Sequence, residues 1–489
     1  MRKAVENQIS FGSVDISQIR IDPKSRDEID KALRGLQFIY TNLELRSEIF
    51  KILEENIQPQ VSKKTGRPGM DLWKILVLGV IRQVCSWDYD KLHHAANNDL
   101  IIREFLGHER IEWENRYYYE IQTLKDNISL LSPEVLKRIN EIVVKATHNV
   151  LGGKKKEELH TNVDSFVVKT DIHYPTDISL LYDSMRKAIE LTADICESYK
   201  IKGWRQSRHL INTLKTSVRG IQNSKRSGKS HSEEKTKKLH EEYITRSDKI
   251  LKRVEESITE IQKKSQDYIS LIAFLEEIDK YKRYADKHID LIYRRVMQGE
   301  EIQHSEKIFS IFEPHTRWIS KGKMGVPVEF GLPLAILKDQ HGLILEYEVM
   351  EHGVDVNVGI AIIARAKRKY TSIKSCSFDK GFWSRENRAA IGEIIEQPIM
   401  MKKGRLNKNE QAEHSTKEFK RLRKKHSSVE SSINGLDHCG LEKCYDNGIM
   451  GFKRCVGLSI LARNIHTLGN LIRAKEDKKI RRKKYKRTA

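Results

Sequence analysis

Cysteine is scarce in this chain, with six residues among 489. They stand at positions 85, 196, 376, 439, 444 and 455, too few and too scattered for the disulfide framework of a secreted protein. Three of them lie near His438, but the spacing of His438, Cys439, Cys444 and Cys455 matches no zinc-binding pattern. We therefore expect ordinary reduced thiols.

Long apolar runs are also missing. The longest, residues 72–81, is interrupted by Lys74 and is far shorter than the roughly 18 apolar residues that a membrane span needs. The first fifteen residues, MRKAVENQISFGSVD, lack the apolar core of a signal peptide. These features predict a cytoplasmic protein with no membrane partner.

Acidic residues are outnumbered, with 68 Asp and Glu against 89 Lys and Arg. The resulting net charge of +21 and pI of about 9.4 indicate a polyanionic partner, of which nucleic acid is the commonest. The end of the chain, residues 475–489, includes KKIRRKKYKR. We expect it to be a disordered basic tail that lies along phosphates without reading sequence.

Helical periodicity dominates residues 1–150. Apolar residues recur every three or four positions over 25–57, and after the turn-rich stretch 60–71 an apolar helix begins at Asp71. Short helices with tight connections follow up to residue 107. This pattern predicts an N-terminal DNA-binding domain of the helix-turn-helix type, with a plain helical bundle as the alternative.

From residue 155 the pattern changes to that of an α/β protein. Alternating β-branched residues predict one or two strands within 155–177, and strands return at 307–312, 326–339 and 343–350, with a hairpin turn at Gln340-His341-Gly342. Between them, residues 178–304 are charged and carry a heptad-like apolar lattice over 251–275, which predicts a helical or coiled-coil insertion. The segments 155–177 and 305–470 together predict a mixed sheet flanked by helices.

Three acidic residues stand where they could converge on this sheet. Asp164 lies in the first expected strand, Asp379 ends a later strand, and Glu430 borders the apolar stripe of a helix over 421–436. Carboxylates are the ligands that Mg²⁺ prefers, and a pair of such ions can activate water for phosphoryl displacement. With 68 acidic residues in the chain, however, spacing alone does not select this set.

A family resemblance does select it. The chain resembles bacterial insertion-sequence transposases of the DDE type, most closely the ISNCY group, over about residues 60–470. The stretch GRPGMDLWKILVLGVIRQ resembles their InsH-like N-terminal helical domain. The other blocks, in the same order as in the family, are VDSFVVKTDIHYPTDISLL, EPHTRWISKGKMGVPVEFG, SFDKGFWSREN and RKKHSSVESSINGLDHCGL.

The resemblance implies an RNase H-like core, with Asp164, Asp379 and Glu430 as the catalytic residues that bind Mg²⁺ or Mn²⁺. Asp171 and Asp177 are rivals of Asp164 for the first position. The insertion accounts for the long separation between the two aspartates.

The surroundings of the glutamate depart from the family pattern. Related transposases often carry Tyr, Arg and Lys at three fixed offsets, where this chain has Arg423, His426 and Asp437. Basic residues near the three acids are candidates for phosphate contact. They are Lys321, Lys323, Lys402, Lys403, Arg405, Arg423, Lys424 and His426.

The sequence thus predicts a DNA transposase that cleaves at the ends of an insertion sequence and joins the freed 3′-hydroxyl to target DNA. No covalent protein–DNA intermediate is expected. The partners would be the terminal inverted repeats, target DNA and at least one further copy of the chain in a synaptic complex. The alternatives are an RNase H-like nuclease without strand transfer, and a non-catalytic DNA-binding regulator.

Overall fold

The computed structural model describes residue 4 and residues 13–56, 69–109, 117–152, 157–226, 232–264, 268–320, 327–352, 355–402 and 404–488. Contacts divide the chain into two compact units, one of Met1–Asp171 with Ile319–Ala489 and the other of Ile172–Trp318. The N-terminal helices, for which we expected a separate domain over 1–150, belong to the same unit as the sheet. None of the helices in the described ranges combines the length and apolar character needed to cross a bilayer.

The N-terminal part of the first unit is helical. Several of its helices begin at Asp or Asn residues whose side chains accept a hydrogen bond from a backbone N–H of the first turn, such as Asp27, Asn42 and Asp88. After a 3₁₀ turn at Ile16–Gln18, the helices are α1 (Glu28–Thr41), α2 (Leu43–Glu55), α3 (Leu72–Val84), α4 (Tyr89–Asn98), α5 (Leu100–Phe105), α6 (Ile121–Ile128) and α7 (Pro133–Gly152).

The described residues form one mixed sheet of seven strands. This confirms the prediction of an α/β chain with a mixed sheet. Its strands are β1 (Leu159–Thr170), β2 (Arg317–Ser320), β3 (Val328–Lys338), β4 (Ile344–Val349), β5 (Ile373–Phe378), β6 (Gln397–Met400) and β7 (Lys443–Cys444). The long strand β1 pairs antiparallel with β3 along one edge, and along the other edge it pairs parallel with β5 and then with β7. Beyond these, β4 pairs antiparallel with β3 and β6 pairs parallel with β5.

Helices cover both faces of this sheet. One apolar core joins the sheet to α12 (Asp355–Lys369) and α13 (Arg385–Ile394), and the other joins it to α16 (Ser428–Leu436) and α17 (Gly448–Thr488). The remaining elements are the 3₁₀ turn η4 (Lys380–Phe382), helices α14 (Lys408–Ser415) and α15 (Lys417–His426), and the π-type turn η5 (Asp437–Leu441). Residues 421–436, which we expected to form a single helix, belong to two helices, because the helix is interrupted at Ser427.

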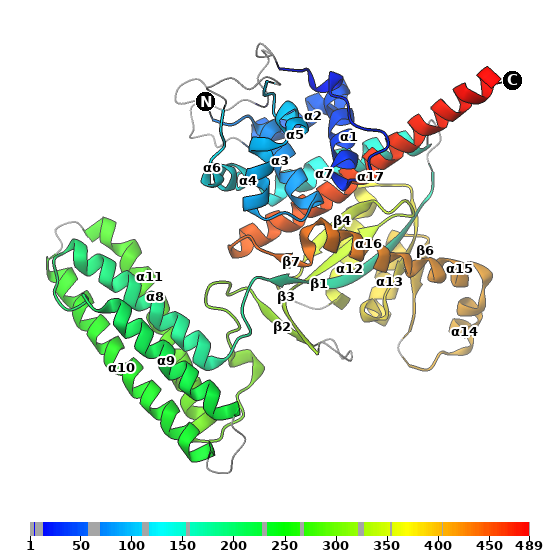
Figure 1. The fold of residues 1–489 in the computed structure, drawn as a ribbon. Helices are drawn as coiled ribbons and strands as arrows, with labels where there is room; N and C mark the ends of the chain where they lie inside the picture. The colour runs from blue at the N-terminus through cyan, green and yellow to red at the C-terminus, as the bar shows by residue number, and fades with distance from the viewer. Residues whose placement is uncertain are drawn as a thin grey trace. The chain divides into compact units, whose positions relative to one another are not determined.

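Helix α17 connects the sheet to the N-terminal helices. Its first half buries Phe452, Val456 and Ile460 against the sheet, while Leu461 and Ile465 belong to the N-terminal core. Figure 1 shows α17 running beside α1 and α7, against which it packs. The helix continues through the segment 475–488, for which we expected disorder. No Gly or Pro follows Gly469, and Lys and Arg favour helix, so nothing in the tail stops the helix.

Two buried amides protect the edge strand β4. The Asn464 side chain of α17 accepts a hydrogen bond from the Ile344 N–H at 3.0 Å and donates one to the Ile344 carbonyl at 2.9 Å. Asn140 of α7 donates to the same carbonyl at 3.1 Å and accepts from Asn464 at 2.7 Å. Unpaired backbone groups on an edge strand invite pairing with other chains, and those of Ile344 are satisfied internally.

The β3–β4 hairpin forms at the predicted turn. Gly342 adopts a positive φ of 81°, and the buried Asp339 carboxylate accepts hydrogen bonds from the His341 and Leu343 N–H groups at 2.9 Å. The strand expected at 307–312 does not form. Ile308 and Ile311 instead pack against Leu180 and Tyr281 in a small core of the second unit.

The second unit consists of α8 (Asp177–Ser198), α9 (Ser207–Arg226), α10 (Ser232–Lys264) and α11 (Tyr268–Ile292), followed by the short turns η2 (Tyr293–Met297) and η3 (His304–Glu306). These helices share one apolar core that includes Met185, Leu214, Tyr243 and Ile278. The heptad lattice expected over 251–275 is divided between α10 and α11, so it does not form one continuous coiled coil.

The packing of α17 on α1 depends on two glycines. A Cβ on Gly469 would lie 1.8 Å from the Lys31 carbonyl oxygen, and one on Gly35 would lie 2.4 Å from that of Ile465. We predict that Gly469→Ala lowers the free energy of unfolding by about 1–3 kcal/mol, because the two helices must separate. Gly392→Ala in α13, where nothing lies within 4 Å, is the control and should raise it by about 0.5–1 kcal/mol. Urea denaturation measures both, and equal effects would contradict this account of the packing.

Candidate active site

Asp164 and Asp379 lie at the same level of the neighbouring strands β1 and β5, each one residue after their last paired residues. In the parallel pairing of β1 with β5, the last register pair is Val163 with Phe378. Asp164 and Asp379 are the next residues on the two strands. Because adjacent strands run about 4.8 Å apart, the pairing brings the two aspartates side by side at the carboxyl end of β5.

The direction of the Asp164 side chain follows from strand alternation. Val163 belongs to the core under α12 and α13, so Asp164 points to the opposite face. On that face Phe166 and Val168 pack with Val429 and Leu436 of α16. Asp164 therefore faces the side of the sheet that α16 covers.

Asp379 occupies the point where the chain leaves the sheet. It stands at the N-cap of η4 and is exposed, and its side chain makes no capping hydrogen bond. Within the described ranges, its carboxylate takes part in no hydrogen bond or ion pair. An exposed carboxylate without such a partner is available to a cation from solution.

Glu430 lies in the first turn of α16. Its neighbours Val429 and Ser432 are buried, and Glu430 itself is exposed at the border of the buried face, as its position beside the apolar stripe predicts. Its carboxylate, too, takes part in no hydrogen bond or ion pair with the residues that the structure describes.

The three carboxylates are not gathered into one cluster. Across the described ranges, no group of three His, Cys, Asp or Glu side chains is arranged to hold a metal ion. The β1–β5 register thus brings Asp164 and Asp379 to neighbouring positions, and Glu430 lies on the adjoining helix α16.

The two rivals of Asp164 have other partners. Asp171, just beyond the end of β1, pairs with Lys443 at 2.5 Å. Asp177 begins α8 in the second unit and pairs with Arg295 at 2.8 Å. Neither shares the level of Asp379 in the β1–β5 register, and this favours Asp164.

A buried lysine, which the sequence reasoning missed, ties α16 to the sheet. Lys338 of β3 is 4 % exposed and lies opposite Asn162, two residues before Asp164. Its ammonium donates to the carbonyl and the hydroxyl oxygen of Ser428, two residues before Glu430, at 2.7 and 2.8 Å. Lys338 thereby links the strand pair that carries Asp164 to the helix that carries Glu430. A single lysine in the apolar run LPLAILK was the signal that could have identified it.

Two of the predicted basic residues lie next to Asp379. The Arg423 guanidinium donates to the Phe378 carbonyl at 3.3 Å, beside the end of β5. The ring of His426 is only 8 % exposed, and burial lowers its pKa to about 4, helped by the Arg423 cation and opposed by the Asp379 carboxylate. His426 is therefore buried, with a pKa below neutrality, and its expected contact with phosphate stays a prediction.

The other predicted basic residues differ in availability. Lys424 and Arg405 are exposed. Lys402 is 14 % exposed and forms an ion pair with Glu410 at 2.8 Å, so its charge is already compensated. Lys321, Lys323 and Lys403 lie outside the described residues.

A polar cavity of about 210 Å³ lies between the sheet and helices α15 and α16. His160 and Ser375 form a hydrogen bond across β1 and β5 at 2.7 Å on its wall. Its other lining residues are Thr161, Asn162, Gln340, Ser377, Leu422, Lys425 and Ser428. The face of the sheet that carries Asp164 is thus polar at its start and apolar beyond the aspartate.

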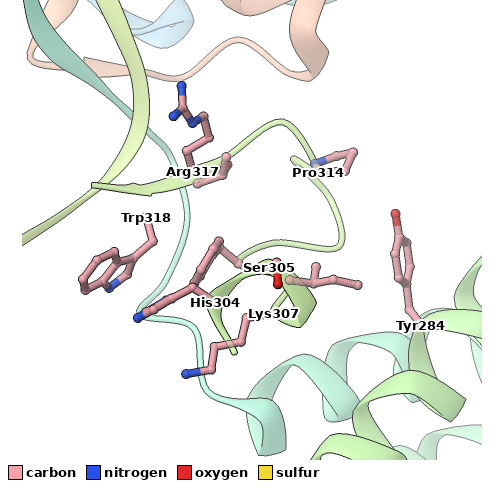
Figure 2. Close-up of a pocket in the computed structure, with 10 residues that line it drawn as sticks. Tyr284, His304, Ser305, Lys307, Pro314, Arg317 and Trp318 are labelled. Carbon is pink, nitrogen blue, oxygen red and sulfur yellow. The ribbon is translucent and has the colours of Figure 1, made fainter. Parts of the chain in front are cut away.

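A second cavity, of about 400 Å³, belongs to the second unit. The rings of His304 and Trp318 stack on its wall with centroids 4.4 Å apart, and Figure 2 shows Tyr284 on the side away from Trp318. Lys307 and Arg317 add positive charge to the lining. None of the predicted catalytic acids contributes to it.

The contribution of Lys338 to stability should depend on pH. Burial lowers the pKa of Lys338 to about 8 from the usual 10.5. Between pH 8 and 10.5 the unfolded chain binds the extra proton, so the contribution of Lys338 to stability rises with pH in this window and is constant below it. We predict that the wild-type free energy of unfolding, minus that of Lys338→Met, rises from pH 8 to 10.5. A flat difference in urea denaturation would show that Lys338 is not buried as a cation.

Similarity to known proteins does not identify this site. Comparisons of the chain with protein-family models, with curated proteins and with solved structures found no match. The functional interpretation therefore depends on the residues and on their geometry.

Proposed function

We propose that this protein is a DNA transposase of the DDE type, with Asp164, Asp379 and Glu430 as its catalytic carboxylates. The observation that carries the proposal is the β1–β5 register, which sets Asp164 beside Asp379. Resemblance selected these residues, and Asp164 and Asp379 are 215 positions apart in the sequence. Their meeting at one sheet position supports a shared role.

The topology supports an RNase H-like core within this proposal. Three antiparallel strands, β1, β3 and β4, come first along the chain, apart from the insertion and β2. Two strands parallel to β1 follow, β5 after α12 and β6 after α13. The insertion between β1 and β3 accounts for the wide sequence separation of the two aspartates.

The donor set fits Mg²⁺ or Mn²⁺. All three candidate ligands are carboxylates, which hard divalent cations prefer, and two of them are exposed. When bound, such ions activate water and neutralise the charge that develops in phosphoryl transfer. Because the three carboxylates do not form a metal-binding group among the described residues, the proposal requires their side chains to come together when metal and DNA bind.

The surrounding residues would position the DNA. Arg423 stands beside the end of β5, and Lys424 and Arg405 are exposed, so they are the candidates for phosphate contact. Holding the scissile phosphate and the attacking oxygen in line supplies much of the catalysis in such reactions. Lys338 would act as a positioning residue, since it fixes the start of α16 against the sheet.

The test uses the DNA that flanks the reading frame as substrate, with Mg²⁺ or Mn²⁺. We predict metal-dependent cleavage and end joining by the wild type. Asp164→Asn, Asp379→Asn and Glu430→Gln should each lose activity on the order of 10²-fold or more, because each removes an anionic ligand of the metal ions that neutralise charge on the reacting phosphate. The matched control is Asp171→Asn, which should keep wild-type activity.

The products separate the possible outcomes. Cleavage without joined products would identify a nuclease that lacks strand transfer. Metal-independent DNA binding, with no cleavage by the wild type, would identify a non-catalytic regulator. Full activity in Asp379→Asn would exclude the proposed catalytic site.

A further inference from the structure

The second unit contains a segment that has no acidic residue. Residues 199–226, which include the α8–α9 turn and all of α9, hold eight Lys and Arg and no Asp or Glu. The neighbouring α10 is nearly balanced, with nine basic and eight acidic residues over 232–264. The positive charge is therefore concentrated on one segment of the unit, the α9 helix that Figure 1 shows beside α8 and α10.

Three of these cations form a straight line on α9. Arg208, Lys215 and Arg219 are seven and four residues apart, so they lie on one face of the helix, and all three are exposed. Leu214 and Val218, each one position before a cation and so about 100° round the helix from it, are buried in the core. At 1.5 Å per residue, the line from the first cation to the last is about 16 Å long.

Three more cations stand on a rigid turn that leads into this line. Lys200, Lys202 and Arg205 are exposed. Between them Trp204 is 5 % exposed, and its indole N–H donates to the Ser257 hydroxyl at 2.9 Å. The buried indole holds the turn in place, so its cations are presented by a fixed backbone.

None of these six cations takes part in an ion pair within the described ranges. A row of uncompensated like charges repels itself and therefore favours the binding of an anionic partner. Arg219 and Lys215, for example, lie one turn apart without an acid between them.

The rest of the exposed α9 surface fits a phosphate backbone better than a protein. Beside the cations it presents Asn212 and Gln222, whose side-chain amides can donate hydrogen bonds to phosphate oxygens. The described part of 199–226 exposes no large apolar side chain, which a protein partner would need as an anchor.

We propose that the α8–α9 turn and the exposed face of α9 bind the sugar–phosphate backbone of duplex DNA without reading its sequence. The choice of DNA as the polyanion rests on the proposed function. The surface would hold the DNA through the second unit, in addition to the contacts made around the catalytic carboxylates.

The test measures binding of the full chain to a duplex of arbitrary sequence, with EDTA present so that no cleavage occurs. Fluorescence anisotropy over a range of salt concentrations gives the slope of log K against log salt, whose magnitude falls by about 0.9 for each phosphate that the protein no longer neutralises. The triple variant R208Q/K215Q/R219Q should therefore bind more weakly, and the magnitude of its slope should be smaller by up to about 2.7.

The matched control removes the same charge from the neighbouring helix. Lys237, Lys249 and Lys252 of α10 are exposed, and the variant K237Q/K249Q/K252Q should keep the wild-type slope. The single variant Arg205→Gln tests the turn independently and should reduce the magnitude of the slope by about 0.9. Circular dichroism verifies that each variant is folded.

A wild-type slope and affinity in the α9 triple variant would overturn the inference, as would an equal loss in the α10 control. Either result leaves the carboxylate chemistry to its own assay, because EDTA removes metal from the binding measurement. Loss of cleavage in Asp379→Asn with wild-type DNA binding would, conversely, support the active site without bearing on α9.

Discussion

The parallel pairing of β1 with β5 is the interaction on which the candidate site depends. It sets Val163 beside Phe378 and so delivers Asp164 and Asp379 to one point, although an inserted helical unit separates them in sequence. A shift of one residue in this register would turn one aspartate to the opposite face of the sheet. The apolar residues on both sides oppose such a shift, since Val163 and Phe378 are buried under one layer of helices and Val168 under the other.

The third carboxylate depends on weaker constraints. Glu430 is carried by a short helix that begins after a break at Ser427, and the contact that fixes its start is a buried ammonium, that of Lys338. A buried charge is costly unless it is hydrogen-bonded, and Lys338 is bonded to both oxygens of Ser428. Helix α17 connects the sheet to the N-terminal helices, because this one continuous helix packs on both.

Local patterns predicted much of the fold. Alternation in LHTNVDSFVVKT predicted β1, and the Gln340-His341-Gly342 turn is found where expected. Patterns failed where packing between distant segments decides. Ile308 and Ile311 were predicted to lie in a strand but pack in a small core of the helical unit. Ser427 and Ser428 did not indicate that the helix is interrupted there. The acids could be named only through family resemblance, and no spacing rule could have shown that Asp164 lies beside Asp379. The burial of His426 could not be predicted from the sequence, because this residue ends the basic run RLRKKH.

The most direct test of this account is anomalous diffraction from crystals soaked in Mn²⁺. The account predicts a manganese peak in contact with the carboxylates of both Asp164 and Asp379, and its loss in Asp379→Asn. Saturating Mn²⁺ with no peak between these two side chains, or with peaks only at other acidic residues, would contradict it.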